Sequence, residues 1–305
     1  MRALTARSGT LEIVEMPTPE PGRGQVRIRM EAATVNPVDL ATRDGHLAAF
    51  YGPRERVGLG WDVAGTIDDM GPGVTGFELG EMVIGVSDIL GLPSKTHADL
   101  VVLDTAAVAR APRGVTPVEA ATIPLNGLTA SQAIDLLGLH EGQSVLVTGA
   151  AGGVGGFAVE LAAARGLRVV ALASPADEEL VRRLGAEWFV PRGADPGPAV
   201  RDLVPGGVDG AIDAAIVGAA ALEAVRGGGA FAAVVGGTAP TPLRGTRVAN
   251  VWIRADGTRL AELAALAETG RLNLRVAGTH PLGEAATAYG RVADGGVRGR
   301  VVLIP

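Results

Sequence analysis

The first 110 residues carry short runs in which apolar and polar positions alternate. These runs are separated by clusters of turn-forming residues, such as Pro19–Gly24 and Gly71–Gly76. An alternating pattern bounded by Gly and Pro is typical of strands that bury one face. The pattern therefore predicts a β-rich segment with strands at Leu11–Met16, Gln25–Ala32, Val63–Asp69, Glu81–Val86 and Ala98–Leu103.

The pattern changes at Pro117, where helical periodicity begins to alternate with short, continuously apolar runs. Alternating helices and buried strands predict an open parallel sheet. The predicted strands are Val145–Val147, Val169–Leu172, Gly210–Ile212 and Phe231–Val235, the first two of them adjacent and parallel. The predicted helices are Glu119–Ile134, Gly155–Arg165, Glu178–Leu184 and Ala220–Arg226. After Asp256 the pattern predicts helices at Leu260–Glu268 and Gly283–Val292 and a closing strand at Gly299–Ile304.

The stretch Ser144–Ser174 has the order strand, glycine-rich turn, helix, strand. Within it, Ala150-x-Gly152-x-x-Gly155 occupies the place of a G-x-G-x-x-G fingerprint, which brings a pyrophosphate to a helix N-terminus. Gly152 would let the backbone approach phosphate oxygens, and Gly155 would let the helix pack closely on its strand. We expect Ala150, Gly152, Gly153 and Val154 to bind a dinucleotide; the alternative is a tight turn without a ligand.

The end of the second strand bears on which dinucleotide is bound. An NAD site usually has Asp or Glu there to accept hydrogen bonds from the ribose hydroxyls. This chain has Ser174, whose hydroxyl can donate to a 2′-phosphate, so the sequence favours NADP(H). Asp177, Glu178 and Glu179 follow closely and argue the other way, unless they only complement a helix dipole.

Composition narrows the class of protein. The chain has 305 residues, 47% hydrophobic residues, 20% charged residues, a mean hydropathy of +0.29 and a formal net charge of −6. These values indicate a compact globular protein, and the negative charge makes nucleic acid an unfavourable partner. The N-terminal segment lacks the apolar core of a signal peptide, and Ala211–Val225 is too short to span a membrane, so we expect a cytoplasmic protein without a membrane partner.

The chain contains no cysteine, which excludes disulfides, thiol catalysis and cysteine-ligated zinc. Lys95 is its only lysine. We therefore expect an arginine wherever the chemistry needs a phosphate clamp or a cationic catalyst.

Several ordered motifs resemble the zinc-independent quinone oxidoreductase branch of the medium-chain dehydrogenase/reductase superfamily. They are VNPVDLATRDG at Val35–Gly45, GLGWDVAGTIDDMGPGVTGFELGEMVIG at Gly58–Gly85, AATIPLNGLTASQAI, the AAGGVG turn, RRLGAEWFV, GGGAFAAVVGG and the GRVVL ending. The resemblance implies an α/β protein with a GroES-like β-rich catalytic domain (1–117 and 255–305) and a Rossmann doubly wound parallel sheet (118–254). It also implies that the C-terminal segment returns to the first domain and that the protein is a homodimer.

Zinc-dependent relatives hold their catalytic metal with a cysteine and a His-Glu pair. The matching positions are Asn36, Trp61 and Asp62, and the four-cysteine lobe of those relatives is missing. Asn is a poor zinc ligand and Trp is none, so the comparison predicts a site without metal. His46 and His97 lack a supporting ligand pattern.

The resemblance assigns further roles near the cofactor. It places Asn36 beside the nicotinamide and the substrate, where its amide could donate to a developing oxyanion; alternatively Asn36 is the turn residue of an Asn-Pro pair. Thr129 would bind the nicotinamide end of the cofactor, or is a helix-interior residue without a role. Gly236 and Gly237 would line the ligand-binding edge of the sheet, or are turn glycines.

Three departures from the family pattern affect the chemistry. Where many relatives have a proton-donating tyrosine this chain has Leu47, so Tyr51 is a substitute donor or only packs under its loop. The usual lysine after the second strand is replaced by Asp177, and a family tyrosine is replaced by Arg192. A guanidinium at position 192 could grip a 2′-phosphate, or it faces solvent without a role.

These observations together predict an NADPH-dependent reductase of quinones or α,β-unsaturated carbonyl compounds that works by hydride transfer. One alternative is an enoyl-thioester reductase of a biosynthetic pathway, against which the missing tyrosine argues. A second is a dinucleotide-binding module without redox turnover.

Overall fold

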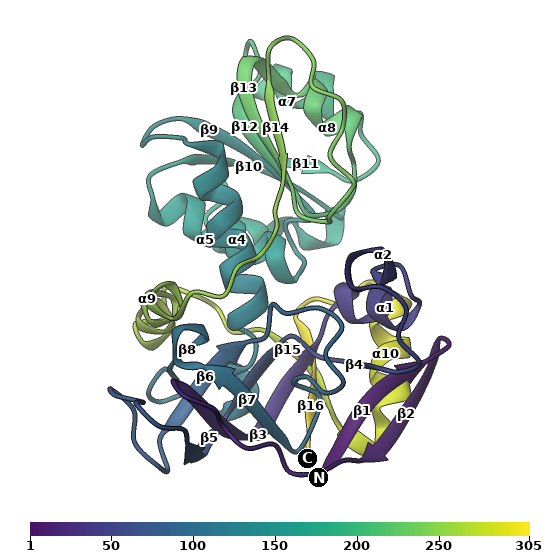
Figure 1. Cartoon of the computed structure of the whole chain (residues 1–305). Helices are drawn as coiled ribbons and strands as arrows, with labels where there is room; N and C mark the ends of the chain where they lie inside the picture. Colours follow the sequence, from purple (N-terminus) through teal and green to yellow (C-terminus); the bar gives the residue numbers. More distant parts are fainter. The chain divides into compact units, whose positions relative to one another are not determined.

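The computed structural model describes residues 1–305, which fold into two compact units (Figure 1). The first unit contains Met1–Leu125, Arg254–Gly270 and Leu274–Pro305, and the second contains Asn126–Ile253 and Arg271–Asn273. The chain thus leaves the first unit after Leu125, returns to it at Arg254, and contributes three further residues to the second unit before its C-terminal part.

The first unit is β-rich, as the alternating pattern predicts. One sheet has the order β2-β1-β4, and a larger sheet has the order β15-β16-β3-β5-β6-β8, with β7 also paired to β3. The strands are β1 (Arg2–Arg7), β2 (Thr10–Glu15), β3 (Gln25–Val35), β4 (Val57–Gly58), β5 (Asp62–Met70), β6 (Met82–Val86), β7 (Leu100–Asp104), β8 (Val108–Arg110), β15 (Val276–Pro281) and β16 (Arg300–Ile304). The closing strand β16 runs antiparallel to β3, so the predicted return of the C-terminal segment is confirmed.

Two apolar clusters form the interior of this unit. Along β3, Val26, Ile28 and Met30 point into one cluster because successive side chains of a strand alternate between its faces. A second cluster contains Leu4, Leu303 and the buried Tyr289. The helices of this unit are α1 (Pro37–Arg43), α2 (Ala48–Tyr51), α3 (Pro117–Ala120), α9 (Gly257–Glu268) and α10 (Ala285–Ala293), with short 3-10 turns η1 (Thr105–Ala107) and η3 (Leu282–Glu284).

The second unit is a parallel six-stranded sheet of order β11-β10-β9-β12-β13-β14. Its strands are β9 (Ser144–Thr148), β10 (Arg168–Ala173), β11 (Trp188–Pro191), β12 (Val208–Asp213), β13 (Val225–Ala233) and β14 (Arg247–Asn250). Its helices are α4 (Pro124–Leu137), α5 (Gly153–Ala164), α6 (Glu178–Arg183), α7 (Pro196–Leu203) and α8 (Ala219–Glu223), with the 3-10 turn η2 (Pro175–Asp177). Val145 pairs with Val169, which confirms that β9 and β10 are adjacent and parallel.

In Figure 1, α5 and α8 lie on opposite sides of this sheet. Because helices cover both faces, the central strands are mostly buried, and every residue of β9 is buried. The sequence pattern thus identifies the doubly wound sheet correctly.

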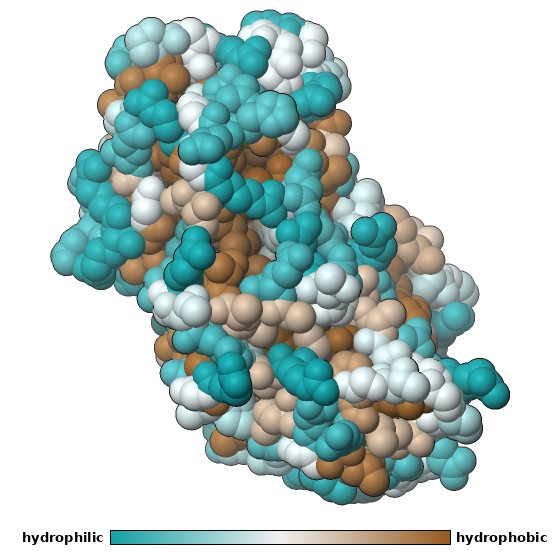
Figure 2. All heavy atoms as spheres, turned by 90° about the vertical axis from the view of Figure 1, so that its left-hand side faces the viewer, coloured by the Kyte–Doolittle hydropathy of each residue, from teal (hydrophilic) through white to brown (hydrophobic).

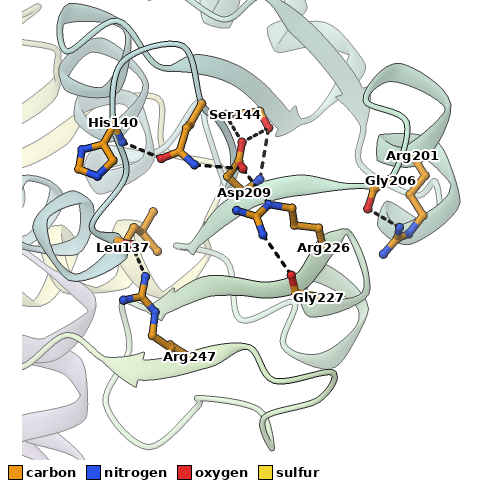
Figure 3. Close-up of polar contacts among 10 residues, drawn as sticks. Leu137, His140, Ser144, Arg201, Gly206, Asp209, Arg226, Gly227 and Arg247 are labelled. Carbon is orange, nitrogen blue, oxygen red and sulfur yellow. Dashed lines mark hydrogen bonds and ion pairs between the residues drawn. The ribbon is translucent and has the colours of Figure 1, made fainter.

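A polar network joins three strands near the amino ends of β9 and β12 (Figure 3). The Asp209 carboxylate accepts hydrogen bonds from the Ser144 backbone N–H (2.8 Å), the Ser144 hydroxyl (3.0 Å) and Gln143 Nε2 (3.1 Å). It also pairs with Arg226 of β13 (2.8 Å). In an open α/β sheet, ligands bind at the carboxyl ends of the strands. This network therefore stabilises the opposite, amino-terminal ends of the strands.

Two predicted helices are wrong in extent. The expected helix Glu119–Ile134 is divided into α3 and α4, since Pro124 has no N–H to continue the first helix. The expected helix Ala220–Arg226 ends at Glu223, because Val225 already belongs to β13 and pairs with Val208. The pattern also misses the strands β1, β4, β8, β11 and β15 and the helices α1, α2 and α7.

On the face drawn in Figure 2, hydrophilic residues cover much of the surface and hydrophobic residues show between them. The most exposed large apolar side chains come from both units; they include Leu79, Trp252, Ile216, Phe50 and Ile89. None of the helices is long and apolar enough to cross a membrane.

Candidate functional site

The glycine-rich turn joins the carboxyl end of β9 to the N-terminus of α5. Gly149 has a φ of +59°, and Gly152 is the N-cap of a 12-residue helix. A Cβ at Gly155 would lie 2.1 Å from the Gly149 carbonyl oxygen, so only glycine lets the helix start this close to the strand. The interpretation of Gly155 is therefore confirmed. Ala150, Gly152, Gly153 and Val154 lie in this turn and in the first turn of α5, where the helix dipole favours an anion.

Asp213 reinforces the same edge of the sheet, a role that the sequence analysis did not foresee. It ends β12, is 1% exposed, and accepts hydrogen bonds from Thr148 Oγ1 (2.6 Å) and from the backbone N–H groups of Val217 (3.0 Å) and Gly218 (2.7 Å). This carboxylate ties the end of β9 to the loop after β12. Its only signal in the sequence is an acidic residue at the end of an apolar run.

Ser174 and Arg192 follow neighbouring strands and lie side by side. Ala173 at the end of β10 pairs with Pro191 at the end of β11, and the backbone N–H of Arg192 donates to the Ala173 carbonyl (2.6 Å). The Arg192 side chain is exposed. Ser174 and Arg192 thus directly follow paired strand ends, just beyond the second strand of the nucleotide-binding unit.

The nearby acids are arranged in a way that limits their negative field. Glu178 forms an ion pair with Arg182 (2.8 Å), and Glu179 forms one with Arg183, both within helix α6. Asp177 is mostly buried, at 7% exposed. Each helix carboxylate is therefore neutralised locally by an arginine four residues further on.

The remaining expected cofactor contacts of the second unit have well-defined places. Thr129 is buried within α4. Gly237 has a φ of +81°, and its N–H donates to Asn250 Oδ1 (3.1 Å). A Cβ at Gly236 would lie 3.0 Å from the ring of Trp252. Both glycines thus have a local reason to be glycine at this turn, which leaves the turn interpretation of the pair open beside the ligand-binding one.

Asn36 lies in a buried polar cluster of the first unit. Its Nδ2 donates to Asp62 Oδ2 (3.1 Å) and to Thr34 Oγ1 (2.9 Å), and its backbone N–H donates to Asp39 Oδ2 (2.8 Å) in the capping box of α1. The Thr34 backbone N–H also donates to Asp62 (2.6 Å). The amide hydrogens of Asn36 are therefore directed to protein acceptors in this structure.

Burial raises the pKa of both carboxyl groups of this cluster, Asp62 and Asp39. It raises the pKa of Asp62 to about 6, against the opposing effect of the hydrogen bonds from Thr34. It also raises the pKa of Asp39, although the backbone N–H groups of Asn36 and Gly60 and the charge of Lys95 favour the ionised form. The cluster therefore holds acids that titrate closer to neutrality than exposed carboxyls do.

His97 is completely buried beside this cluster. Its Nε2 lies 3.0 Å from the Thr34 carbonyl oxygen, and its Nδ1 lies 3.0 Å from the Tyr289 hydroxyl. A carbonyl can only accept, so Nε2 carries the proton and Nδ1 accepts from Tyr289. Burial lowers the pKa of His97 to about 4, so the ring is neutral at physiological pH.

Lys95 is the residue that sequence reasoning missed. It is 4% exposed, and its Nζ lies 3.8 Å from the centre of the Trp61 ring. Burial lowers the pKa of its ammonium, against the opposing charges of Asp39, Asp88 and Asp62. The sequence analysis considered only arginines as cationic groups for the site, whereas this buried cation of the first unit is a lysine. The position of Lys95 as the only lysine was the available signal.

Tyr51 is half-buried at the end of α2 and packs against the apolar cluster that contains Leu4 and Tyr289. A Cβ at Gly91 would lie 2.6 Å from the Tyr51 Cβ, so the following loop presses on this side chain. Burial raises the pKa of its phenol. Packing under the loop is therefore part of what Tyr51 does, and proton donation stays a prediction.

The donors at the positions that ligate zinc in zinc-dependent relatives do not fit a metal. Trp61 has no ligating atom, and the side chains of Asn36 and Asp62 are joined by a hydrogen bond. No group of three or more His, Cys, Asp or Glu side chains is arranged to hold an ion.

Two family models match the chain. The alcohol dehydrogenase GroES-like domain matches residues 22–113, and the zinc-binding dehydrogenase domain matches residues 176–303. Among curated proteins, a chloroplast envelope quinone oxidoreductase homolog of Arabidopsis thaliana is 34% identical over 194 residues, which is 60% of this chain and 58% of that protein. A 2-methylene-furan-3-one reductase of Solanum lycopersicum is 28% identical over 97% of this chain and 77% of its own length.

Solved structures extend the similarity to the whole chain. The quinone oxidoreductase from Coxiella burnetii has a TM-score of 0.88 at 26% identity and covers 100% of this chain and 99% of its own. An NAD-dependent alcohol dehydrogenase has a TM-score of 0.87 at 32% identity, with 100% of both chains covered. A mycobacterial protein complexed with NADPH has a TM-score of 0.84 at 27% identity, again over 100% of both chains. With its GroES-like unit and its parallel dinucleotide-binding sheet, the chain belongs to the medium-chain dehydrogenase/reductase superfamily and is an oxidoreductase of the branch that contains the quinone oxidoreductases.

Proposed function

We propose that this protein is an NADPH-dependent, zinc-independent reductase of quinones or α,β-unsaturated carbonyl compounds. The observation that carries the cofactor choice is the pair Ser174 and Arg192, which directly follow the paired ends of β10 and β11. A guanidinium and a hydroxyl donate more strongly to a charged 2′-phosphate than to an uncharged ribose hydroxyl, and neither repels the phosphate as a carboxylate would. The mycobacterial neighbour complexed with NADPH supports the same choice, whereas the NAD-dependent neighbour keeps NADH as the competing cofactor.

The residues of the turn fit a dinucleotide. The first turn of α5 would face the pyrophosphate, and the Asp213 network would keep the strand ends in place without moving on binding. When bound, a reduced nicotinamide supplies a hydride. The chain's own contribution is to hold the electrophilic carbon of the substrate in position and to stabilise the oxygen that gains negative charge.

The acceptor class follows from the chemistry that the first unit offers. Without a metal ion to polarise a carbonyl, easily reduced acceptors are favoured, because a quinone or an enone spreads the incoming charge over a conjugated system. The curated relatives support this class, since they are named as a quinone oxidoreductase homolog and as a reductase of a methylene-furanone. The test is NADPH oxidation with a panel of quinones and enones, with and without a chelator, together with elemental analysis for zinc. Turnover in chelator is expected. NADPH binding without turnover on any acceptor would favour a cofactor-binding module instead.

The cofactor assignment predicts that NADPH binds more tightly than NADH and that Arg192→Ala removes most of the difference. A charge-assisted hydrogen bond to the 2′-phosphate corresponds to about a ten- to hundredfold preference. Measuring the dissociation constants of NADPH and NADH for the wild type and for Arg192→Ala tests both expectations.

Arg168→Ala is the matched control. Arg168 lies at the other end of β10, where it pairs with Glu187 (2.7 Å), so its loss should leave the preference unchanged. Equal affinities of the wild type for both cofactors would contradict the NADP(H) assignment. A preference that survives Arg192→Ala would contradict only the role of Arg192.

A further inference from the structure

The backbone around Lys95 is held in a fixed place by two glycines. A Cβ at Gly58 would lie 2.6 Å from Ser94 Cα, and one at Gly60 would lie 2.5 Å from the His97 backbone nitrogen. Side chains at either position would therefore push the segment 94–97 away. The His97 N–H donates to the Leu59 carbonyl (3.0 Å), which joins the two segments directly. The backbone at Lys95 is thus closely packed against the segment that contains Gly58 and Gly60.

The side chain of Lys95 is nearly enclosed, yet its ammonium is not locked to a carboxylate. It rests on the face of Trp61, and Asp39, Asp62 and Asp88 act on it electrostatically without an ion pair or a hydrogen bond. Enclosing an ammonium is costly unless its donors are satisfied, and an apolar side chain would fill the same space more favourably. A chain that otherwise uses arginine throughout keeps one lysine at this place.

The neighbours of Lys95 give this placement a chemical meaning. Trp61 and Asp62 are two of the three positions where zinc-dependent relatives hold their metal, and here the ammonium lies against Trp61. The charged or titratable groups that face it are Asp39 of α1, Asp62 of β5, Asp88 of the loop after β6, and His97, which is neutral. An ammonium with donors free of protein acceptors can bind an oxygen that develops negative charge.

We propose that Lys95 is a catalytic residue: its ammonium donates a hydrogen bond to the substrate oxygen that gains charge on hydride addition, and then supplies the proton. The inference rests on the proposed reductase function. For an enone, the hydride pair forms a C–H bond at the β-carbon, the C=C π pair becomes the new double bond between the α-carbon and the carbonyl carbon, and the C=O π pair moves onto the oxygen. The N–H bond of Lys95 then breaks as its proton goes to this enolate oxygen. The neutral amine then recovers a proton from water.

The first test compares Lys95→Met and Lys95→Arg with the wild type. Lys95→Met removes the charge at similar volume and should lower kcat by about 100-fold or more, while the dissociation constant for NADPH stays unchanged. Lys95→Arg keeps the charge and should recover part of the loss. Wild-type kcat should fall at alkaline pH as Lys95 loses its proton, and this alkaline fall should be absent from both variants.

A second test uses the absence of cysteine. Lys95→Cys alkylated with 2-bromoethylamine restores an amine at this position alone, because the chain has no other cysteine. The restored amine is less basic than lysine, so activity should return with its alkaline limb moved to lower pH. Thr75→Cys, treated in the same way, is the control for the alkylation and should behave as wild type.

A readout independent of turnover comes from NMR. Protein labelled with ¹⁵N-lysine gives a single side-chain resonance, because Lys95 is the only lysine. Titration with 4-nitrophenolate, which mimics a planar oxyanion, should shift this resonance, and Lys95→Met should bind the phenolate more weakly.

The outcomes separate this inference from the proposed function. If the wild type reduces enones or quinones but Lys95→Met keeps its kcat and only melts at a lower temperature, Lys95 is a counter-ion for Asp39 and the inference is wrong. If no acceptor is reduced, the proposed function fails, and the phenolate titration decides whether Lys95 binds an oxyanion. An unmoved lysine resonance would overturn the inference in that case.

Discussion

At the scale of single residues, the first unit carries ionisable groups whose pKa values are changed by burial in opposite directions. Burial lowers the pKa of His97 from 6.5 to about 4 and raises that of Asp62 from 3.8 to about 6. The folded state therefore binds fewer protons than the unfolded chain at His97, so acid destabilises it between pH 6.5 and about 4. It binds more protons at Asp62, so acid stabilises it between about pH 6 and 3.8. The two groups partly cancel in the wild type.

Replacing His97 separates its effect on the pH dependence of stability from that of Asp62. In His97→Gln, the amide can donate to Thr34 and accept from Tyr289 but cannot take up a proton. The loss of stability between pH 6.5 and 4 should shrink by about 3 kcal/mol at most, the value of the His97 shift. Urea unfolding at both pH values measures the change. His140→Gln, at an exposed position, is the control and should keep the wild-type dependence. An unchanged dependence in His97→Gln would show that the buried imidazole does not set it.

At the scale of elements, the strand–turn–helix unit shows how closely one position can be specified. The Gly155 site is closed by backbone atoms, since a Cβ would meet the carbonyl oxygen and carbon of Gly149 at 2.1 and 2.7 Å. Backbone atoms cannot move aside as the end of a flexible side chain can. Any larger residue must therefore lift α5 from the turn that the cofactor would use.

We expect Gly155→Ala to destabilise the protein by about 2 kcal/mol or more through overpacking, and to weaken NADPH binding at least tenfold. Gly290→Ala is a matched control in helix α10, where a Cβ meets no atom within 4 Å. The control should be neutral or stabilising by up to about 1 kcal/mol, since alanine favours a helix over glycine. Thermal unfolding and NADPH titration of both variants measure the two effects. Wild-type affinity in a folded Gly155→Ala protein would contradict the expected role of the turn.

At the scale of the molecule, the sheet of the second unit ends in an unprotected strand. β14 pairs with β13 on one side only, and Val235, Leu243 and Trp252 nearby expose apolar surface. An edge strand with free backbone groups is a template for pairing with a second copy. Phe231 lies inside the sheet, since its strand β13 pairs with both β12 and β14, so the edge belongs to β14.

We propose a homodimer that forms across β14, because pairing between two copies would satisfy both edges. Ala249→Lys places a charge on the edge strand and should convert the dimer to a monomer. Light scattering at micromolar concentration measures the mass. Leu79→Lys, an exposed position of the first unit, should leave the dimer intact. A wild-type protein that is already monomeric would contradict the proposal.

The sequence by itself determined the features that depend on local spacing. Alternation along Gln25–Ala32 identifies a strand because successive side chains face opposite sides, and the order of strand, glycines and helix at Ser144–Ser174 identifies the nucleotide-binding unit. Gly155 could be assigned from spacing alone, since the clash that it avoids is with residues six and five positions before it.

Only the tertiary structure decided what depends on residues far apart in the chain. The short strands β4 and β11 have too few residues for a pattern, and their neighbours in the sheets specify them. Ser174 and Arg192 follow paired strand ends because of the register between β10 and β11. Lys95 reads as an ordinary loop residue until Gly58, Gly60 and Trp61 close around it. Burial of this kind is set by the three-dimensional packing of distant segments, so no local pattern of residues can reveal it.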